Sequence, residues 1–97
     1  MDPRALFDLT GRQALVIGAG SGIGAALAEG LAGVGAAVAC AEVHGETADR
    51  TAEAIRVRGG SATAHAVDAT DEAAGEALVA SLPRLVACVA TPAVNVR

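Results

Sequence analysis

Short apolar runs alternate along the chain with segments in which apolar residues recur every three or four positions. Continuous apolar runs cover residues 14–17, 36–41 and 85–89, whereas residues 61–67 alternate alanines with other residues, and each of these stretches has the length of a strand. The segments between them, residues 23–32, 47–57 and 70–82, have the spacing of helices. This order predicts strand–helix repeated three times, followed by a fourth strand. Such alternation is typical of an α/β fold with a parallel sheet and right-handed crossovers.

Each predicted helix is expected to bury one apolar stripe against the sheet. The stripes are Ile23, Leu27, Leu31 and Val34 in the first helix, Ala48, Ala52 and Ile55 in the second, and Ala74, Leu78 and Leu82 in the third. Thr70 is expected to cap the third helix. In a doubly wound order the strands would lie 3-2-1-4, with Leu85–Val89 as an apolar edge. We therefore expect either self-association through that strand or pairing with a C-terminal half of the protein.

The composition indicates a small domain that folds around its own core. The chain has 97 residues, 53% of them hydrophobic, and Phe7 is its one aromatic residue. Its net charge is −4, and its seven basic residues are scattered arginines that form no basic stripe. This charge pattern excludes a nucleic-acid partner. The two cysteines, Cys40 and Cys88, lie in apolar runs without metal-type spacing, so we expect buried thiols and no metal site.

One stretch, residues 14–41, is apolar enough to resemble a membrane span. It is interrupted by glycines and lacks flanking basic anchors, so no membrane association is expected. The N-terminal residues have no apolar segment of signal-peptide length, which predicts a cytoplasmic location.

The sequence VIGAGSGIG, residues 16–24, places Gly18, Gly22 and Gly24 at the turn from the first strand into the first helix. A helix N-terminus offers unpaired N–H groups and a partial positive charge, and glycines let a diphosphate come close to them. This turn is therefore predicted to bind the diphosphate of a dinucleotide. Below, residues 18–24 are called the glycine loop.

Glu42 ends the second predicted strand. An acidic side chain there can accept hydrogen bonds from both hydroxyls of an adenosine ribose, and its charge would repel a 2′-phosphate. Glu42 therefore favours NAD, with NADP less favoured. The alternative is a solvent-facing glutamate at a strand end, and both interpretations are kept at this point.

The GxxxGxG spacing and the run LTGRQALVIGAGSGIGAALAEGLAGVGAAVACAE resemble the opening of the short-chain dehydrogenase/reductase family. The resemblance implies a Rossmann-like three-layer fold, of which residues 1–97 would be the N-terminal cofactor-binding portion. It departs at Ile17, where the family usually has threonine. Ser21 stands where family members that prefer NADP often carry a basic residue, and this agrees with Glu42.

The resemblance also implies further cofactor contacts. DATD, residues 68–71, is similar to the family's DVTD, so Asp68 would accept from the adenine amino group and the backbone of Ala69 would touch the ring. The alternative is that Asp68 and Asp71 only charge a helix start. After the fourth strand, residues 90–93 replace the family's NNAG, with Ala90 in the first position. The full set of expected cofactor-binding residues is Gly18, Ser21, Gly22, Ile23, Gly24, Glu42, Asp68, Ala69 and Ala90.

No catalytic residue is expected within these 97 residues. The family transfers hydride with a serine, a tyrosine and a lysine, whereas this chain has neither tyrosine nor lysine. His44 and His65 are the acid/base candidates near neutral pH, but neither has a plausible catalytic partner. We therefore expect an alcohol or carbonyl oxidoreductase portion that is inactive alone. A stand-alone nucleotide-binding or assembly module is the alternative, and FAD enzymes are disfavoured because Ile23 occupies the place of their third glycine.

Overall fold

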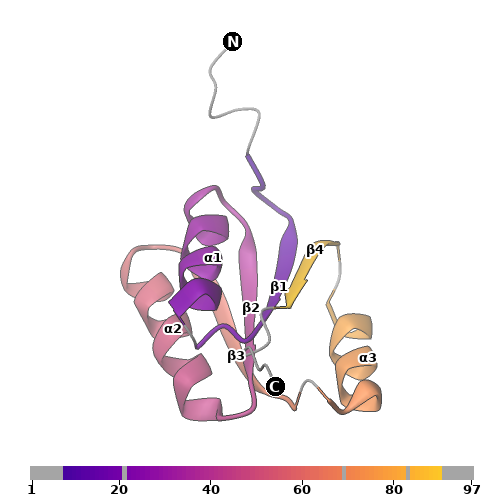
Figure 1. The fold of residues 1–97 in the computed structure, drawn as a ribbon. Helices are drawn as coiled ribbons and strands as arrows, with labels where there is room; N and C mark the ends of the chain where they lie inside the picture. The colour runs from indigo at the N-terminus through magenta and orange to yellow at the C-terminus, as the bar shows by residue number, and fades with distance from the viewer. Residues whose placement is uncertain (1–7, 21, 69, 83, 91–97) are drawn as a thin grey trace.

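The computed structural model describes residues 8–20, 22–68, 70–82 and 84–90 (Figure 1). Its elements follow the predicted order. The strands are β1 (Gln13–Ile17), β2 (Ala37–Glu42), β3 (Ser61–Ala66) and β4 (Leu85–Ala90), and the helices are α1 (Gly22–Gly33), α2 (Gly45–Val57) and α3 (Glu72–Ala80). The predicted boundaries all agree with these to within two residues. The α/β fold class is confirmed.

The described strands form one parallel sheet in the order β3-β2-β1-β4, as predicted. Helices α1 and α2 cover one face and α3 covers the other, which gives three layers (Figure 1). The chain moves outward from β1 to β2 and β3, and then returns to place β4 on the other side of β1. Open α/β sheets bind their ligands at the carboxyl ends of the strands where the order reverses, which here are the ends of β1 and β4.

The core is built from small side chains on both faces of β1 and β2. On one face Val16, Val38 and Cys40 pack with Ala52 and Ile55 of α2. On the other face a smaller cluster joins Leu15, Ala39 and Ala41 of the sheet to Leu78 of α3. Because β1 and β2 are buried on both faces, they appear in the sequence as continuous apolar runs.

β3 is an edge strand, and its sequence alternates accordingly. Ala62 and Ala64 pack against the core, whereas Ser61 and Thr63 are exposed. The Nε of Arg56 in α2 donates a 3.0 Å hydrogen bond to the carbonyl of Ala62. This bond occupies one acceptor of the strand edge, which otherwise could pair with another chain. The expected self-association through β4 stays a prediction.

The predicted buried stripe of α1 is wrong for Ile23, Leu27 and Val34 and holds in part for Leu31. Gly24 and Ala28 are the residues of this helix that are buried, whereas Ile23 is 73% exposed, Leu27 39% and Val34 38%. Leu31 is partly buried against the core. The physical reason is the tight turn between β1 and α1, because a helix that starts so close to the sheet fits against it only through its smallest residues.

The prediction for the start of α3 is also wrong. Asp71, and not Thr70, is the N-cap: its carboxylate accepts a 3.1 Å hydrogen bond from the amide of Ala74. Thr70 instead donates to Asp68 through both its amide and its hydroxyl. The helix ends at Ala80, so Leu82 follows it, although Leu82 still packs against the smaller cluster. Pro83, the next residue, lies outside the described residues.

Cys40 is fully buried, as expected for a structural thiol, whereas the side chain of Cys88 lies outside the described part. Burial raises the pKa of Cys40 from 9.0 to about 11. Between these two values the unfolded chain loses the thiol proton while the folded chain keeps it, so the stability contribution is lost as the pH rises.

We therefore expect the free energy of unfolding to fall by up to about 3 kcal/mol between about pH 9 and pH 11 on account of this thiol. Urea unfolding at several pH values checks this, with Cys40→Ala as the control in which this part of the fall should disappear. An identical pH dependence in the two proteins would contradict the burial of a protonated thiol.

No helix in the described ranges has both the length and the unbroken apolar character that crossing a bilayer requires.

Candidate functional site

The turn from β1 into α1 lies at the carboxyl end of the sheet. β1 ends at Ile17, and Gly18 follows it with a φ of +88°, a left-handed conformation that favours glycine. α1 begins at Gly22, so the glycine loop makes the reversal in very few residues. The predicted position of Gly18 and Gly24, one directly after the strand and the other in the first turn of the helix, agrees with the structure.

The first part of the loop is held against β2. The amides of Gly18 and Ala19 both donate to the carbonyl of Ala41, at 2.8 and 3.2 Å. From the other side, the hydroxyl of Thr51 in α2 donates a 2.9 Å hydrogen bond to the carbonyl of Ala19. Thr51 is 7% exposed, and this bond satisfies its buried hydroxyl. The loop is thus fixed by β2 and α2 together.

Glu42, at the end of β2, reaches the glycine loop. Its Oε2 accepts a 2.9 Å hydrogen bond from the amide of Gly20, in a half-buried position. A bond to an ionised acceptor of this kind is stronger than one between neutral groups. Glu42 therefore touches the loop directly, and the interpretation of a solvent-facing glutamate does not describe its contacts.

Gly20 and Thr47 are site residues that the sequence reasoning missed. A Cβ at Gly20 would lie 2.6 Å from both Cβ and Oγ1 of Thr47, and 3.0 Å from Cγ of Glu42. The loop, the end of β2 and the first turn of α2 therefore meet at this point. No local pattern signals such a meeting, because Gly20 belongs to neither the GxxxGxG set nor an apolar stripe.

The second part of the loop presents the start of α1. Gly22, Ile23 and Gly24 occupy the first turn, where the backbone N–H groups have no acceptor within the helix. A Cβ at Gly22 would meet nothing within 4 Å, so packing among the described residues does not require glycine there. Open space beside amides at a helix N-terminus fits the diphosphate of a dinucleotide. The residues present therefore fit the predicted cofactor.

The end of β3 lies beside the end of β2. The amide of Val67 donates a 2.8 Å hydrogen bond to the carbonyl of Glu42, and Asp68 follows immediately. Asp68 is exposed, and its Oδ1 accepts from the amide and the hydroxyl of Thr70, at 2.9 and 2.8 Å. These two bonds lower the pKa of Asp68. Asp68 thus shapes the turn before α3, while its exposure keeps it accessible at the same end of the sheet.

The remaining predicted residues are placed only in part. Ala90 is the last residue of β4 and pairs in register with Ile17, so its backbone lies beside the start of the glycine loop. Ser21, Ala69 and residues 91–97, which include the rest of the replaced NNAG segment, lie outside the described residues.

Neither histidine takes part in this assembly. His44 is exposed and precedes α2, where its side chain makes no capping hydrogen bond. His65 lies in β3, and its Nε2 is 2.9 Å from the hydroxyl of Thr63. His65 therefore has a partner of its own on the edge strand.

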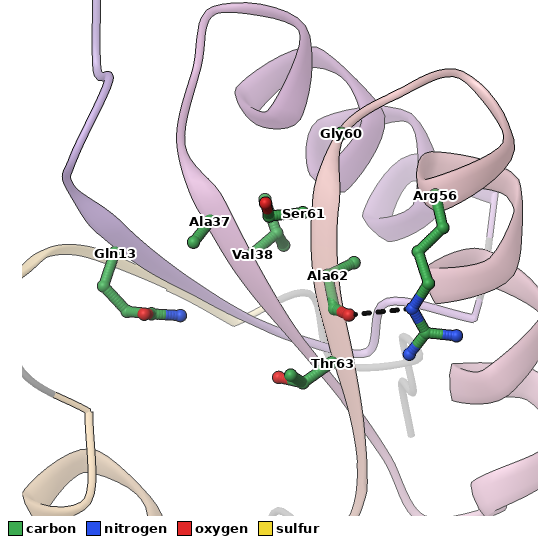
Figure 2. Close-up of a pocket in the computed structure, with 8 residues that line it drawn as sticks. All are labelled: Gln13, Ala37, Val38, Arg56, Gly60, Ser61, Ala62 and Thr63. Atoms are coloured by element: carbon green, nitrogen blue, oxygen red, sulfur yellow. Dashed lines mark hydrogen bonds between the residues drawn. The ribbon is translucent and has the colours of Figure 1, made fainter.

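A separate hollow of about 350 Å³ lies near the opposite ends of the strands. Figure 2 shows Gln13, Ser61 and Thr63 around it, with the guanidinium of Arg56 bonded to Ala62. β2 begins at Ala37 and β3 at Ser61, so these residues mark the amino ends. Parallel α/β sheets bind ligands at the carboxyl ends, so the glycine loop is the better candidate.

A comparison with protein families identifies the family to which this chain belongs. Residues 12–90 match the family described as short chain dehydrogenase. The chain belongs to the short-chain dehydrogenase family. It therefore belongs to a family of oxidoreductases, and the expected resemblance is confirmed.

One individual relative matches this chain over part of its length only. The chain is 45% identical over 60 residues to 1-deoxy-11-beta-hydroxypentalenate dehydrogenase of Streptomyces exfoliatus, a match that covers 62% of this chain and 22% of that protein. The aligned region therefore covers less than a quarter of the length of that relative.

Two similar solved structures contain a nicotinamide dinucleotide. A 7α-hydroxysteroid dehydrogenase in complex with NADH and 7-oxo glycochenodeoxycholic acid is 32% identical, with a TM-score of 0.76 over 82% of this chain and 31% of that one. A Beutenbergia cavernae protein described as an NAD(P)-dependent gluconate 5-dehydrogenase, with NADP at low occupancy, is 40% identical, with a TM-score of 0.68 over 74% of this chain and 28% of that one. Nicotinamide dinucleotides are therefore the cofactors of the family, and both kinds occur among the similar structures.

Proposed function

We propose that residues 1–97 are the N-terminal part of an NAD(P)-binding domain, and that they bind NAD in preference to NADP. In the complete enzyme this part would hold the cofactor for hydride transfer between an alcohol and a carbonyl compound. The observation that carries the proposal is the 2.9 Å hydrogen bond from Gly20 to Glu42, because it joins a carboxylate to the loop that precedes the open helix start.

The chain's own residues would bind two different parts of the cofactor, its diphosphate and its adenosine ribose. The amides of Gly22, Ile23 and Gly24 would donate to the diphosphate, where the helix dipole also favours negative charge. Glu42 would accept from the ribose hydroxyls, and its charge would repel a 2′-phosphate. Gly18 gives the loop its conformation, with a φ of +88°. Bound NAD supplies the hydride-accepting nicotinamide.

The adenine would lie at the ends of β2, β3 and β4. We assign Asp68 as acceptor for the adenine amino group and the backbone at Ala69 and Ala90 as contacts of the adenosine. The exposure of Asp68 and the pairing of Ala90 with Ile17 support this assignment. Ser21, which carries no positive charge, supports NAD over NADP.

This chain is expected to bind without catalysing. It contains no tyrosine and no lysine, which are two of the three residues that the family's hydride transfer implies. His44 and His65 do not join the glycine loop. Substrate selection and hydride transfer therefore belong to residues other than these 97.

Titration calorimetry of the chain with NAD, NADP and AMP tests the proposal. We expect NAD and AMP to bind with affinities within about tenfold of each other, because the assigned contacts all lie on the adenosine and diphosphate side. NADP should bind more weakly than NAD. Absence of binding by all three would overturn the proposal, and tighter binding of NADP would overturn the role of Glu42.

A further inference from the structure

The orientation of Glu42 depends on a residue without a side chain. Gly20 donates its amide hydrogen to Oε2 of Glu42 at 2.9 Å, although the two residues are 22 positions apart in the sequence. The bond aims the carboxylate at the glycine loop and keeps its charge there. A side chain at position 20 would have to share this space.

The side chains of Thr47 and Glu42 already occupy that space. A Cβ built at Gly20 would stand 2.6 Å from Cβ of Thr47 and 3.0 Å from Cγ of Glu42, closer than non-bonded carbons approach. Thr47 cannot easily yield, because its Cβ is attached to the first turn of α2 and its hydroxyl donates a 2.7 Å hydrogen bond to the carbonyl of His44. The flexible side chain of Glu42 would be displaced first, or the loop would open.

We propose that Gly20 is a specificity-determining residue that positions Glu42, with Thr47 as the fixed wall behind it. This inference rests on the proposed function, because it concerns how the same site chooses between NAD and NADP. A displaced carboxylate loses its hydrogen bond to the loop and moves its charge away from the ribose. Both changes lower the preference for NAD without any change at the residues that bind the diphosphate.

The test is the ratio of the dissociation constants of NADP and NAD in Gly20→Ala. We expect this ratio to fall by about tenfold or more, since an ionic hydrogen bond and the placement of a charge are lost together. Gly30→Ala is the matched control: Gly30 lies in α1 and a Cβ there meets nothing within 4 Å, so its ratio should stay unchanged. An unchanged ratio in Gly20→Ala would overturn the inference while leaving the proposed function intact.

The double variant Gly20→Ala, Thr47→Gly tests the wall. Removing the Thr47 side chain gives the new methyl group room, so Glu42 can return and the ratio should recover by several-fold towards the wild-type value. A ratio that stays as low as in the single variant would overturn the role of Thr47. Absence of NAD binding by the wild-type chain would overturn the proposed function and this inference with it.

An NMR measurement on the chain that keeps Gly20 tests the inference even if Gly20→Ala does not fold. In NMR spectra of the nitrogen-15-labelled protein, the amide hydrogen of Gly20 should exchange with solvent more slowly in the wild-type chain than in Glu42→Ala, which has no acceptor for it. Equal exchange rates of the Gly20 amide in the two proteins would overturn the inference directly.

Discussion

Replacing Gly22 by alanine should leave the chain at least as stable as before and should still weaken NAD binding by about five- to a hundredfold. Gly22 opens α1, and a Cβ there meets no atom of the described structure within 4 Å. Alanine is the better helix former by up to about 1 kcal/mol, so the folded state gains or keeps stability. The same methyl group would occupy the space that we assign to the diphosphate. Thermal unfolding and calorimetry with NAD measure the two effects.

Gly18→Ala separates this effect from a general loss of structure. Gly18 has a φ of +88°, so alanine there is strained and should destabilise the fold by about 1–2 kcal/mol. In that variant, weaker binding should accompany a lower melting temperature, whereas Gly22→Ala should show weaker binding alone. Unchanged NAD affinity in Gly22→Ala would mean that the open space beside the first turn of α1 is not the diphosphate site.

Glu42→Gln should reduce the preference for NAD over NADP by about ten- to a hundredfold. Glutamine still offers an oxygen to the amide of Gly20, so the 2.9 Å contact with the loop can persist. The negative charge that opposes a 2′-phosphate is lost, and so is the strong ionic acceptor for the ribose hydroxyls. NADP should therefore gain affinity while NAD loses it. Competition between the two dinucleotides, followed by calorimetry, measures the ratio.

Glu76→Gln is the charge-matched control for this change. Glu76 is an exposed residue of α3, so its replacement alters the net charge equally but at another element. The ratio of the NADP and NAD affinities should stay within about twofold of the wild type, because salt screens exposed charges over about 10 Å. Equal shifts in both variants would mean that net charge, and not the position of Glu42, sets the preference.

The strands and helices were predictable because the sequence patterns that mark them are local. Short apolar runs such as residues 14–17 and 36–41 mark strands buried on both faces, and glycines close the helices between them. The alternation in residues 61–66 marks an edge strand, since one of its faces stays exposed. Parallel strands joined by single helices then leave few topologies, and the doubly wound order among them is the one observed.

The packing of α1 could not be predicted in the same way. Glu29 is the helix's one charged residue, so apolar or small residues lie on every side and periodicity does not single out a face. The large residues Ile23 and Leu27 suggested the stripe, but the short glycine loop brings the helix close to the sheet. Gly24 and Ala28 therefore face inward. Distance to the sheet, and not hydrophobicity, decided the orientation.

The sequence by itself determined that a glycine-rich turn joins the first strand to the first helix and that an acidic residue ends the second strand. Only the tertiary structure decided that these two features touch, through Gly20 and Glu42, with Thr47 behind them and Thr51 holding Ala19 from α2. These partners are 22 and 32 residues apart in the chain. A pattern of neighbouring residues carries no signal for such contacts, because the packing of the sheet against its helices creates them.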